Sequence, residues 1–305
     1  MERPQRSQAS PLGGSRRARL TGSHLRIRRC EYLLAAYFLY TCVLAETLPA
    51  PRPIAFVAPL LNALVLAAYA LLVAVDSLRH RLLLGVIRDW YPLALMLLAY
   101  REIGWFAQPH APRLENLWIV WDRFLLERCG LHAAIEILGP VLPSILEIAY
   151  TLVYALAPFS LAMLYVYRRR TRVAPFLFVF VLGVLLCYAQ YPLWPSEPPR
   201  TVFRGQDFPS YLTIFRRFNW WMLGGYGIHI SVFPSAHVAG AFSAAFAMRR
   251  HLPEKPWVGR LLLVLAILIA TATVYGRYHY LADAVAGFAM SLVAAAAGRV
   301  FTRSS

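Results

Sequence analysis

The sequence predicts an all-α, polytopic membrane protein with about eight transmembrane helices. The 305 residues are 59% hydrophobic, and their mean hydropathy is +0.51. Only 15% of the residues are charged, whereas a soluble domain has about 25%. Apolar runs recur near the roughly 20 residues with which a helix spans a bilayer. These features favour membrane spans over a soluble protein with several buried helices.

The hydropathy pattern places the spans along the chain. They are roughly residues 30–49, 54–77, 86–106, 136–166, 174–194, 232–249, 257–276 and 279–299. The fourth span is long and contains Pro140, Pro143 and Pro158. Because proline interrupts helical hydrogen bonding, we expect this span to begin as an interfacial segment.

The segment 108–134, between the third and fourth spans, is more polar. It carries Trp118, Trp121, Asp122, Arg123 and Arg128. This mixture of aromatic and charged residues is typical of an amphipathic connection that lies at the membrane interface.

Four regions follow from this pattern. Residues 1–29 are polar and rich in arginine, and we expect them to form a disordered cytoplasmic tail rather than a signal peptide. Residues 30–85 are expected to form a transmembrane hairpin, and residues 86–299 the main membrane domain. Residues 300–305 are expected to form a second cytoplasmic tail.

The arginines predict the orientation, because short cytoplasmic loops are enriched in basic residues. Arg16–Arg29 place the N-terminus inside, and eight crossings return the C-terminus to the same side. The other basic inside segments are then Arg79–Arg81, Arg168–Arg172, Arg249–Pro256 and Arg299–Ser305. The outside loop 195–231 is an exception, because it holds Arg200, Arg204, Arg216 and Arg217. Phosphate binding is one explanation for this excess.

The net charge of +16 does not indicate a nucleic-acid partner, because the arginines cluster in the tail and in short loops. Lys255 is the only lysine, a bias typical of a GC-rich genome, so we expect a bacterial inner (plasma) membrane protein. The four cysteines are Cys30, Cys42, Cys129 and Cys187. They form no CxxC or Cys/His metal spacing, and we expect no disulfide and no cysteine-bound metal.

Three polar clusters fall on the outer side in this topology. They are Tyr191–Arg200 at the end of the fifth span, Phe233–His237 at the start of the sixth, and Tyr275–Asp283 at the start of the eighth. Three segments at one depth predict a site that none of them would indicate alone.

His279 and Asp283 are four residues apart, which puts them within contact on one helical face. A carboxylate beside an imidazole fixes its tautomer and stabilises its charged form. The pair therefore predicts a nucleophilic histidine. The structural alternative is a His–Asp pair at the membrane interface whose two side chains only hydrogen-bond to each other.

His237 lies near the start of its predicted helix. Pro234 suits a first helical turn, and Ser231 or Ser235 could cap or line that end. A helix start binds anions, and a histidine there can protonate a leaving oxygen. The alternative is a histidine that faces lipid headgroups. Similarly, Arg200 and Arg277 could bind phosphate through their guanidinium groups, or extend to the interface as arginines near helix ends often do.

These residues resemble the type 2 phosphatidic acid phosphatase superfamily of membrane lipid phosphatases. That family carries Lys-x6-Arg-Pro, Pro-Ser-Gly-His and Ser-Arg-x5-His-x3-Asp. The second motif is similar to Pro234-Ser235-Ala236-His237, and the third to His279-x3-Asp283. The resemblance implies a six-helix core in which His279 attacks phosphorus, Asp283 orients it and His237 protonates the leaving group.

The chain departs from the family pattern at two places. Thr273 stands where the third motif has arginine, and the first motif reads Pro198-Pro199-Arg200 without its lysine. The segment with Tyr-Pro and Pro-Pro, and the helix of small residues after His279-Tyr280, are more similar to the branch that contains inositol phosphorylceramide synthase. The resemblance covers roughly residues 90–300.

The missing cations predict the substrate charge. A phosphomonoester carries nearly two negative charges and a phosphodiester one, so we expect headgroup transfer from a phosphodiester lipid to an alcohol. A lipid phosphomonoester phosphatase is the alternative, because Arg204, Arg216, Arg217 or Arg277 could replace the missing cations. We expect no metal and no cofactor, because arginines and helix starts would neutralise the phosphate.

Two readings of other classes remain open. A transporter or scaffold would use the prolines of the fourth span and the pairs Arg88–Asp89 and Arg101–Glu102 as a permeation path. A haem protein would use His237 and His279 as axial ligands, but Asp283 and the arginines would have no role in it.

Overall fold

The computed structural model describes residues 27–49, 52–79, 81–108, 112–203, 208–228 and 232–303. Within these ranges the chain is helical and contains no strand. Almost all of the expected N-terminal tail, together with Arg204 and Ser231, lies outside the described residues.

The helices follow one another with short connections. Their bounds are α1 Arg29–Thr47, α2 Arg52–Arg79, α3 Leu82–Ile103, α4 Pro112–Arg123, α5 Leu131–Glu136, α6 Val141–Val166, α7 Val173–Tyr188, α8 Pro199–Val202, α9 Ile214–Tyr226, α10 Ala236–His251, α11 Pro256–Tyr275 and α12 Leu281–Arg303. The π-helical turn Phe124–Arg128 continues α4, and single 3-10 turns lie at Gly104–Phe106, Arg170–Arg172 and Tyr191–Leu193.

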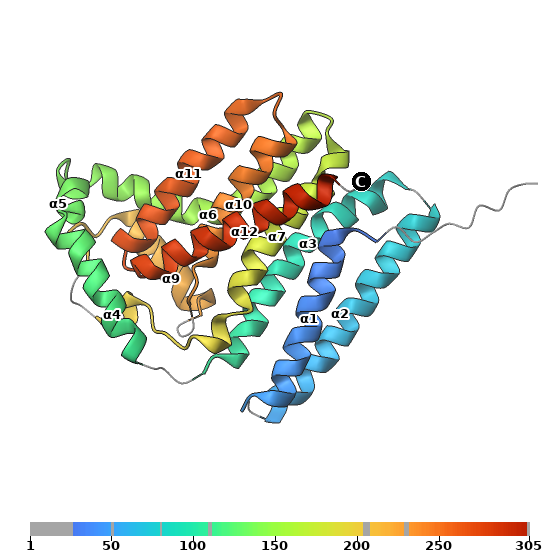
Figure 1. The fold of residues 1–305 in the computed structure, drawn as a ribbon, viewed down its shortest axis with the longest axis horizontal. Helices are drawn as coiled ribbons and strands as arrows, with labels where there is room; N and C mark the ends of the chain where they lie inside the picture. The colour runs from blue at the N-terminus through green and yellow to red at the C-terminus, as the bar shows by residue number, and fades with distance from the viewer. Residues whose placement is uncertain are drawn as a thin grey trace, which may run out of the picture.

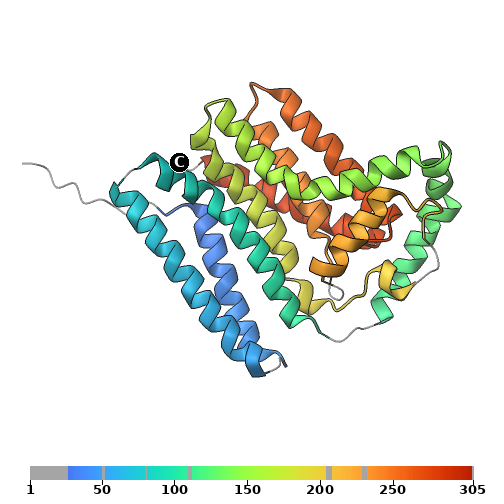
Figure 2. The same ribbon diagram turned by 180° about the vertical axis from the view of Figure 1, so that it is seen from behind.

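Helix α10 is the centre of the bundle. It packs against α6, α7, α11 and α12, and alanine and glycine along its length let these neighbours approach closely. The α1–α2 hairpin and α3 lie at one edge of the molecule, and α4 and α5 lie at the opposite edge (Figure 1; seen from behind in Figure 2). One end of the bundle holds the ends of α3, α7 and α11 and the starts of α6, α10 and α12.

Six helical segments are long and apolar enough to cross a membrane within the described chain. They are Arg52–Arg79, Leu82–Phe106, Val141–Val166, Arg170–Leu193, Pro256–Tyr275 and Leu281–Val300. An integral, all-helical membrane fold is therefore confirmed, with six of the eight predicted spans in this set.

The other two predicted spans, 30–49 and 232–249, form helices outside that set. Helix α1 has 19 residues and includes Glu31 and Glu46. Helix α10 has only 16 residues, which corresponds to about 24 Å. Protein surrounds it along most of its length, because all but four of its residues are buried.

The predicted fourth span begins later than expected. Gly139 has a left-handed φ of 63° and breaks the helix between α5 and α6. Helix α6 then begins at Val141, next to Pro140, and continues unbroken past Pro158. The expected interfacial beginning corresponds to α5 and to this turn.

The charged residues of α3 are held by structural partners. Arg88 pairs with Glu31 of α1 at 2.6 Å and with Asp76 of α2 at 3.0 Å. Asp89 pairs with Arg28 at 2.7 Å. A further residue of α3, Glu102, accepts a hydrogen bond from Asn62 at 2.7 Å. These contacts join α3 to α1 and α2.

Candidate active site

The three polar clusters meet at one end of the bundle. Ser235 and His237 lie at the start of α10, Arg277 and His279 lie in the connection from α11 to α12, and Asp283 is in the first turn of α12. Arg200 reaches the same place from α8. The ring centroids of His237 and His279 are 5.7 Å apart, so the two expected catalytic histidines face a common space.

Asp283 orients His279. The Nδ1 atom of His279 is 3.0 Å from Oδ2 of Asp283, and both side chains are buried. The same carboxylate oxygen accepts the backbone N–H of Tyr280 at 3.1 Å. With Nδ1–H donating to the carboxylate, Nε2 of His279 keeps its lone pair available for attack.

A tight connection after α11 positions His279. The carbonyl oxygen of Thr273 accepts the backbone N–H groups of Tyr278 and His279, both at 2.9 Å. Arg277 has a φ of 63°, in the left-handed region, which turns the chain sharply before His279. Thr273, which stands where the family motif has arginine, donates its hydroxyl to the carbonyl of Ala270 at 2.8 Å.

The starts of α10 and α12 are tied together. Ser235 caps α10 by accepting the N–H of Val238 at 3.4 Å, and its own N–H donates to the carbonyl of Asp283 at 3.0 Å. A Cβ at Gly287 would lie 2.3 Å from the carbonyl oxygen of Ser235. Glycine at 287 therefore allows the close approach that brings His237 beside His279.

An aromatic stack supports His237. The ring of Tyr150, on α6, lies on His237 with a centroid distance of 5.1 Å and an interplanar angle of 14°. Tyr278 also stacks on Tyr150, with a centroid distance of 4.0 Å. Sequence reasoning did not assign Tyr150 to the site, although its spacing to Tyr154 places two aromatic rings on one face of an apolar helix.

Arg200 brings positive charge beside His279. Its guanidinium donates to the carbonyls of Tyr278 at 2.9 Å and Ile228 at 3.3 Å. Among the residues that the structure describes, no carboxylate lies within ion-pair distance of Arg200. Burial lowers the pKa of His279, and the charge of Arg200 lowers it further, so the imidazole is neutral at neutral pH.

Arg277 is engaged elsewhere. Its Nη1 atom lies 2.6 Å from Oδ2 of Asp122, at the end of α4, and its side chain is 2% exposed. The other oxygen of Asp122 accepts the N–H of Leu281 at 2.7 Å. The phosphate-binding role expected for Arg277 stays a prediction, because this guanidinium serves first to fasten α4 to the start of α12.

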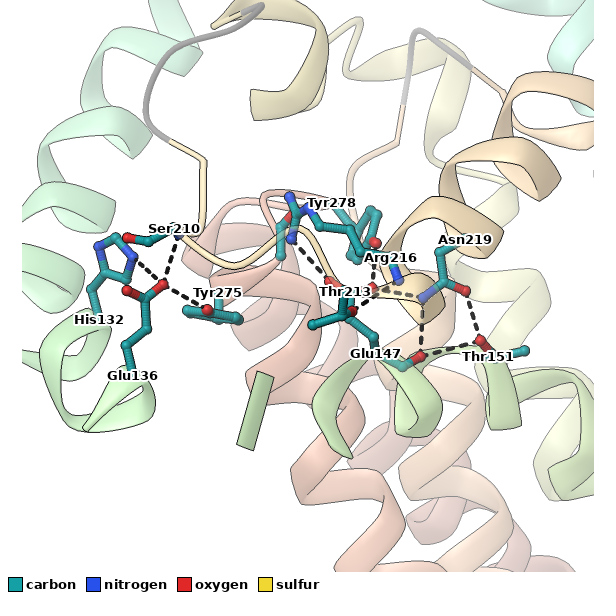
Figure 3. Close-up of polar contacts among 11 residues, drawn as sticks. His132, Glu136, Glu147, Thr151, Ser210, Thr213, Arg216, Asn219, Tyr275 and Tyr278 are labelled. Carbon is teal, nitrogen blue, oxygen red and sulfur yellow. Dashed lines mark hydrogen bonds and ion pairs between the residues drawn. The ribbon is translucent and has the colours of Figure 1, made fainter. Parts of the chain in front are cut away.

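Arg216, considered above as a replacement cation, is also occupied (Figure 3). It donates to Glu147 of α6 and to the carbonyl of Gly276, both at 2.9 Å. Tyr278 donates to Glu147 at 2.6 Å, and Asn219 does so at 2.7 Å. The sequence alone indicates that Glu147 has a partner. It is the only charged residue of the run 137–166, and a charge within a membrane span requires a partner.

A second cluster drawn in Figure 3 surrounds Glu136 of α5. Glu136 accepts hydrogen bonds from the hydroxyl of Tyr275 and the N–H of Ser210, both at 2.8 Å. His132 lies 2.9 Å from the same carboxylate. Partial burial raises the pKa of Glu136, but the bonds from Ser210 and Tyr275 and the charge of His132 lower it by more.

Comparison with known proteins places the chain in a family. The model of the PAP2 superfamily matches residues 120–297, more than half of the chain. The chain belongs to this superfamily, and membership supports a lipid phosphatase-type activity in a membrane. All six of the expected site residues lie within the matched range.

One curated relative is similar over a short segment. It is a PA-phosphatase related-family protein of Dictyostelium discoideum, 36% identical over 72 residues. The aligned segment covers 24% of this chain and 12% of the relative, so the chain spans only a small part of that protein. No solved structure matches the chain.

Proposed function

We propose that the protein cleaves the bond between phosphorus and the lipid oxygen of a lipid phosphate ester, through a phosphohistidine intermediate on His279. The observation that carries this proposal is the buried pair of His279 and Asp283 with His237 beside it, the two imidazoles facing one space. The positive-inside pattern supports placing this set at the extracytoplasmic face.

The two chemical steps use the same residues. The lone pair of His279 Nε2 forms a bond to phosphorus, and the bond from phosphorus to the lipid oxygen breaks. His237 gives a proton to the departing oxygen, and the lipid alcohol leaves. His237 then takes a proton from an incoming hydroxyl group, which attacks phosphorus and releases His279.

We further propose that the preferred substrate is a phosphodiester lipid and the incoming hydroxyl that of an alcohol, as in an inositol phosphotransferase. The charge inventory supports this. Arg277 and Arg216 are paired with carboxylates, whereas Arg200 contacts only carbonyl oxygens within the described chain. Within the described residues, a site whose guanidinium is that of Arg200 suits a phosphodiester with one negative charge better than a phosphomonoester with nearly two.

The second candidate is a lipid phosphomonoester phosphatase, in which water is the incoming hydroxyl. The superfamily match and the name of the Dictyostelium relative favour it. In that case the start of α10 supplies the remaining positive potential, since backbone N–H groups at a helix start bind anions.

An assay with purified protein tests both candidate functions. The protein is given phosphatidic acid or phosphatidylinositol, each with and without ceramide or diacylglycerol. Headgroup transfer that requires an alcohol lipid supports the transferase; phosphate release from phosphatidic acid alone supports the phosphatase. His279→Ala should abolish turnover, and Asp283→Asn should lower kcat by about 10⁴-fold, as loss of the equivalent carboxylate does in a serine protease. His132→Ala is the control. Near-normal turnover in His279→Ala would overturn the mechanism.

A further inference from the structure

A cavity of about 310 Å³ lies between α3, α6, α7 and α10. Its wall is apolar and aromatic, and it includes Leu93, Leu97, Ala157 and Val184. None of the described residues that line it is an aspartate, glutamate, lysine or arginine. Such a wall excludes ions and polar groups, and it suits a hydrocarbon.

His237 forms part of the cavity wall. Its Nε2 atom is buried and has no hydrogen-bond partner among the described residues. An unpaired polar atom in an apolar wall is costly, and an oxygen carried by the occupant of the cavity would relieve that cost. The cavity therefore begins at the histidine to which the proposed mechanism assigns the leaving oxygen.

The mouth of the cavity lies between α3 and α6. Leu97 is 63% exposed and Tyr154 is 48% exposed, although both line the cavity. Leu82–Phe106 and Val141–Val166, which contain these residues, are both apolar segments of spanning length. An opening between two such segments faces hydrocarbon, so an apolar chain can pass through it from the bilayer.

One face of helix α3 forms one wall of the cavity. Leu93, Met96, Leu97 and Tyr100 all line the cavity, and their spacing puts them on one helical face. Across the cavity, Gly240 keeps α10 close to α7, because a Cβ there would lie 3.1 Å from Val184. Helix α3 lies outside residues 120–297, the part that the superfamily shares.

We propose that this cavity binds an alkyl chain of the lipid substrate, the chain attached to the leaving oxygen, and that the α3 face selects chain length. The identity of the leaving oxygen rests on the proposed function. The bulk of Leu93, Met96 and Leu97 sets the space available, and residues beyond the shared part of the superfamily therefore determine which lipids react.

The test combines substitutions that narrow the cavity with substrates of different acyl-chain length. Leu97→Trp narrows the mouth at an exposed position, and Ala157→Phe fills the cavity from α6. Displacing about two methylene groups corresponds to about a tenfold loss of kcat/KM. We expect that loss with long-chain substrate and a smaller loss with a dihexanoyl lipid, because its short chain fills less of the cavity. Leu83→Trp, at an exposed position about four turns before Leu97 on α3 and outside the cavity lining, is the matched control.

A binding measurement separates this proposal from the catalytic one. A lipid with a photoreactive group at the end of its acyl chain should label the cavity residues of α3 and α6, and should do so in His279→Ala. Labelling without turnover of any lipid keeps the cavity assignment and overturns the proposed function. Turnover with equal losses for long and short chains in both variants, or with labelling outside the cavity, overturns the cavity assignment.

Discussion

The guanidinium of Arg277 and the carboxylate of Asp122 form an ion pair in which both side chains are almost completely shielded from solvent, at 2.6 Å. Asp122 also accepts the N–H of Leu281, the first residue of α12. The pair thus fixes the beginning of the helix that carries Asp283, at the cost of removing two charges from water.

Breaking this pair should strongly destabilise the protein. Asp122→Asn leaves a buried guanidinium without its counter-charge, a change that costs about 3–5 kcal/mol. Thermal unfolding in detergent, followed by tryptophan fluorescence, should show a clear fall in Tm. Asp122→Leu combined with Arg277→Met removes both charges and should recover much of the loss; a double variant no better than the single one would contradict this account.

Arg216 should act on catalysis through position. Its two hydrogen bonds diverge, to Glu147 and to the carbonyl of Gly276, and the compact ammonium of lysine cannot make both. Arg216→Lys should loosen the chain before His279 and lower kcat by about 10–100-fold while KM changes little. Arg217→Lys, on the exposed side of the same helix, is the control. Equal effects in the two variants would count against a positioning role.

The Glu136 cluster predicts a pH-dependent contribution to stability. The folded-state pKa of Glu136 lies below its ordinary value, so the contribution is complete above about pH 4.5 and is lost as the pH falls through the folded pKa. At neutral pH, Glu136→Gln should therefore have a lower Tm than the natural protein, and the difference should shrink toward pH 3. Glu127→Gln, at an exposed position, should show no such trend; a difference independent of pH would exclude ionisation as the cause.

The outward face of α9 predicts contact with lipid. Ile214 is 74% exposed, and Phe218 and Trp221 follow it on one stripe, while Arg216 and Asn219 point inward. This arrangement is apolar outside and polar inside, the reverse of a helix that faces water. Brominated lipids should quench Trp221, measured as the difference between the natural protein and Trp221→Phe. Trp118, which is buried, should give no difference in Trp118→Phe; quenching that is equal in the two would refute the assignment.

The features that could be predicted from the sequence are those that depend on local residue patterns. Apolar runs of spanning length located the helices, and the alternation of topology predicted that His237 would meet His279 and Asp283. The partners of Arg277 and Arg216 were missed, because each ion pair joins segments far apart in the chain and depends on tertiary packing. The stacking of Tyr150 on His237 was missed for the same reason, since ring contacts have no sequence spacing of their own.

The length of α10 has a consequence for the surrounding membrane. If its basic end, Arg249–His251, lies at the headgroups of one leaflet, its 16 residues reach about 24 Å toward the other side of a hydrocarbon core of about 30 Å. His237 would then lie several ångströms below the opposite headgroups. A reacting lipid must sink by that amount, or the bilayer must thin locally. This placement predicts that turnover rises as the bilayer becomes thinner.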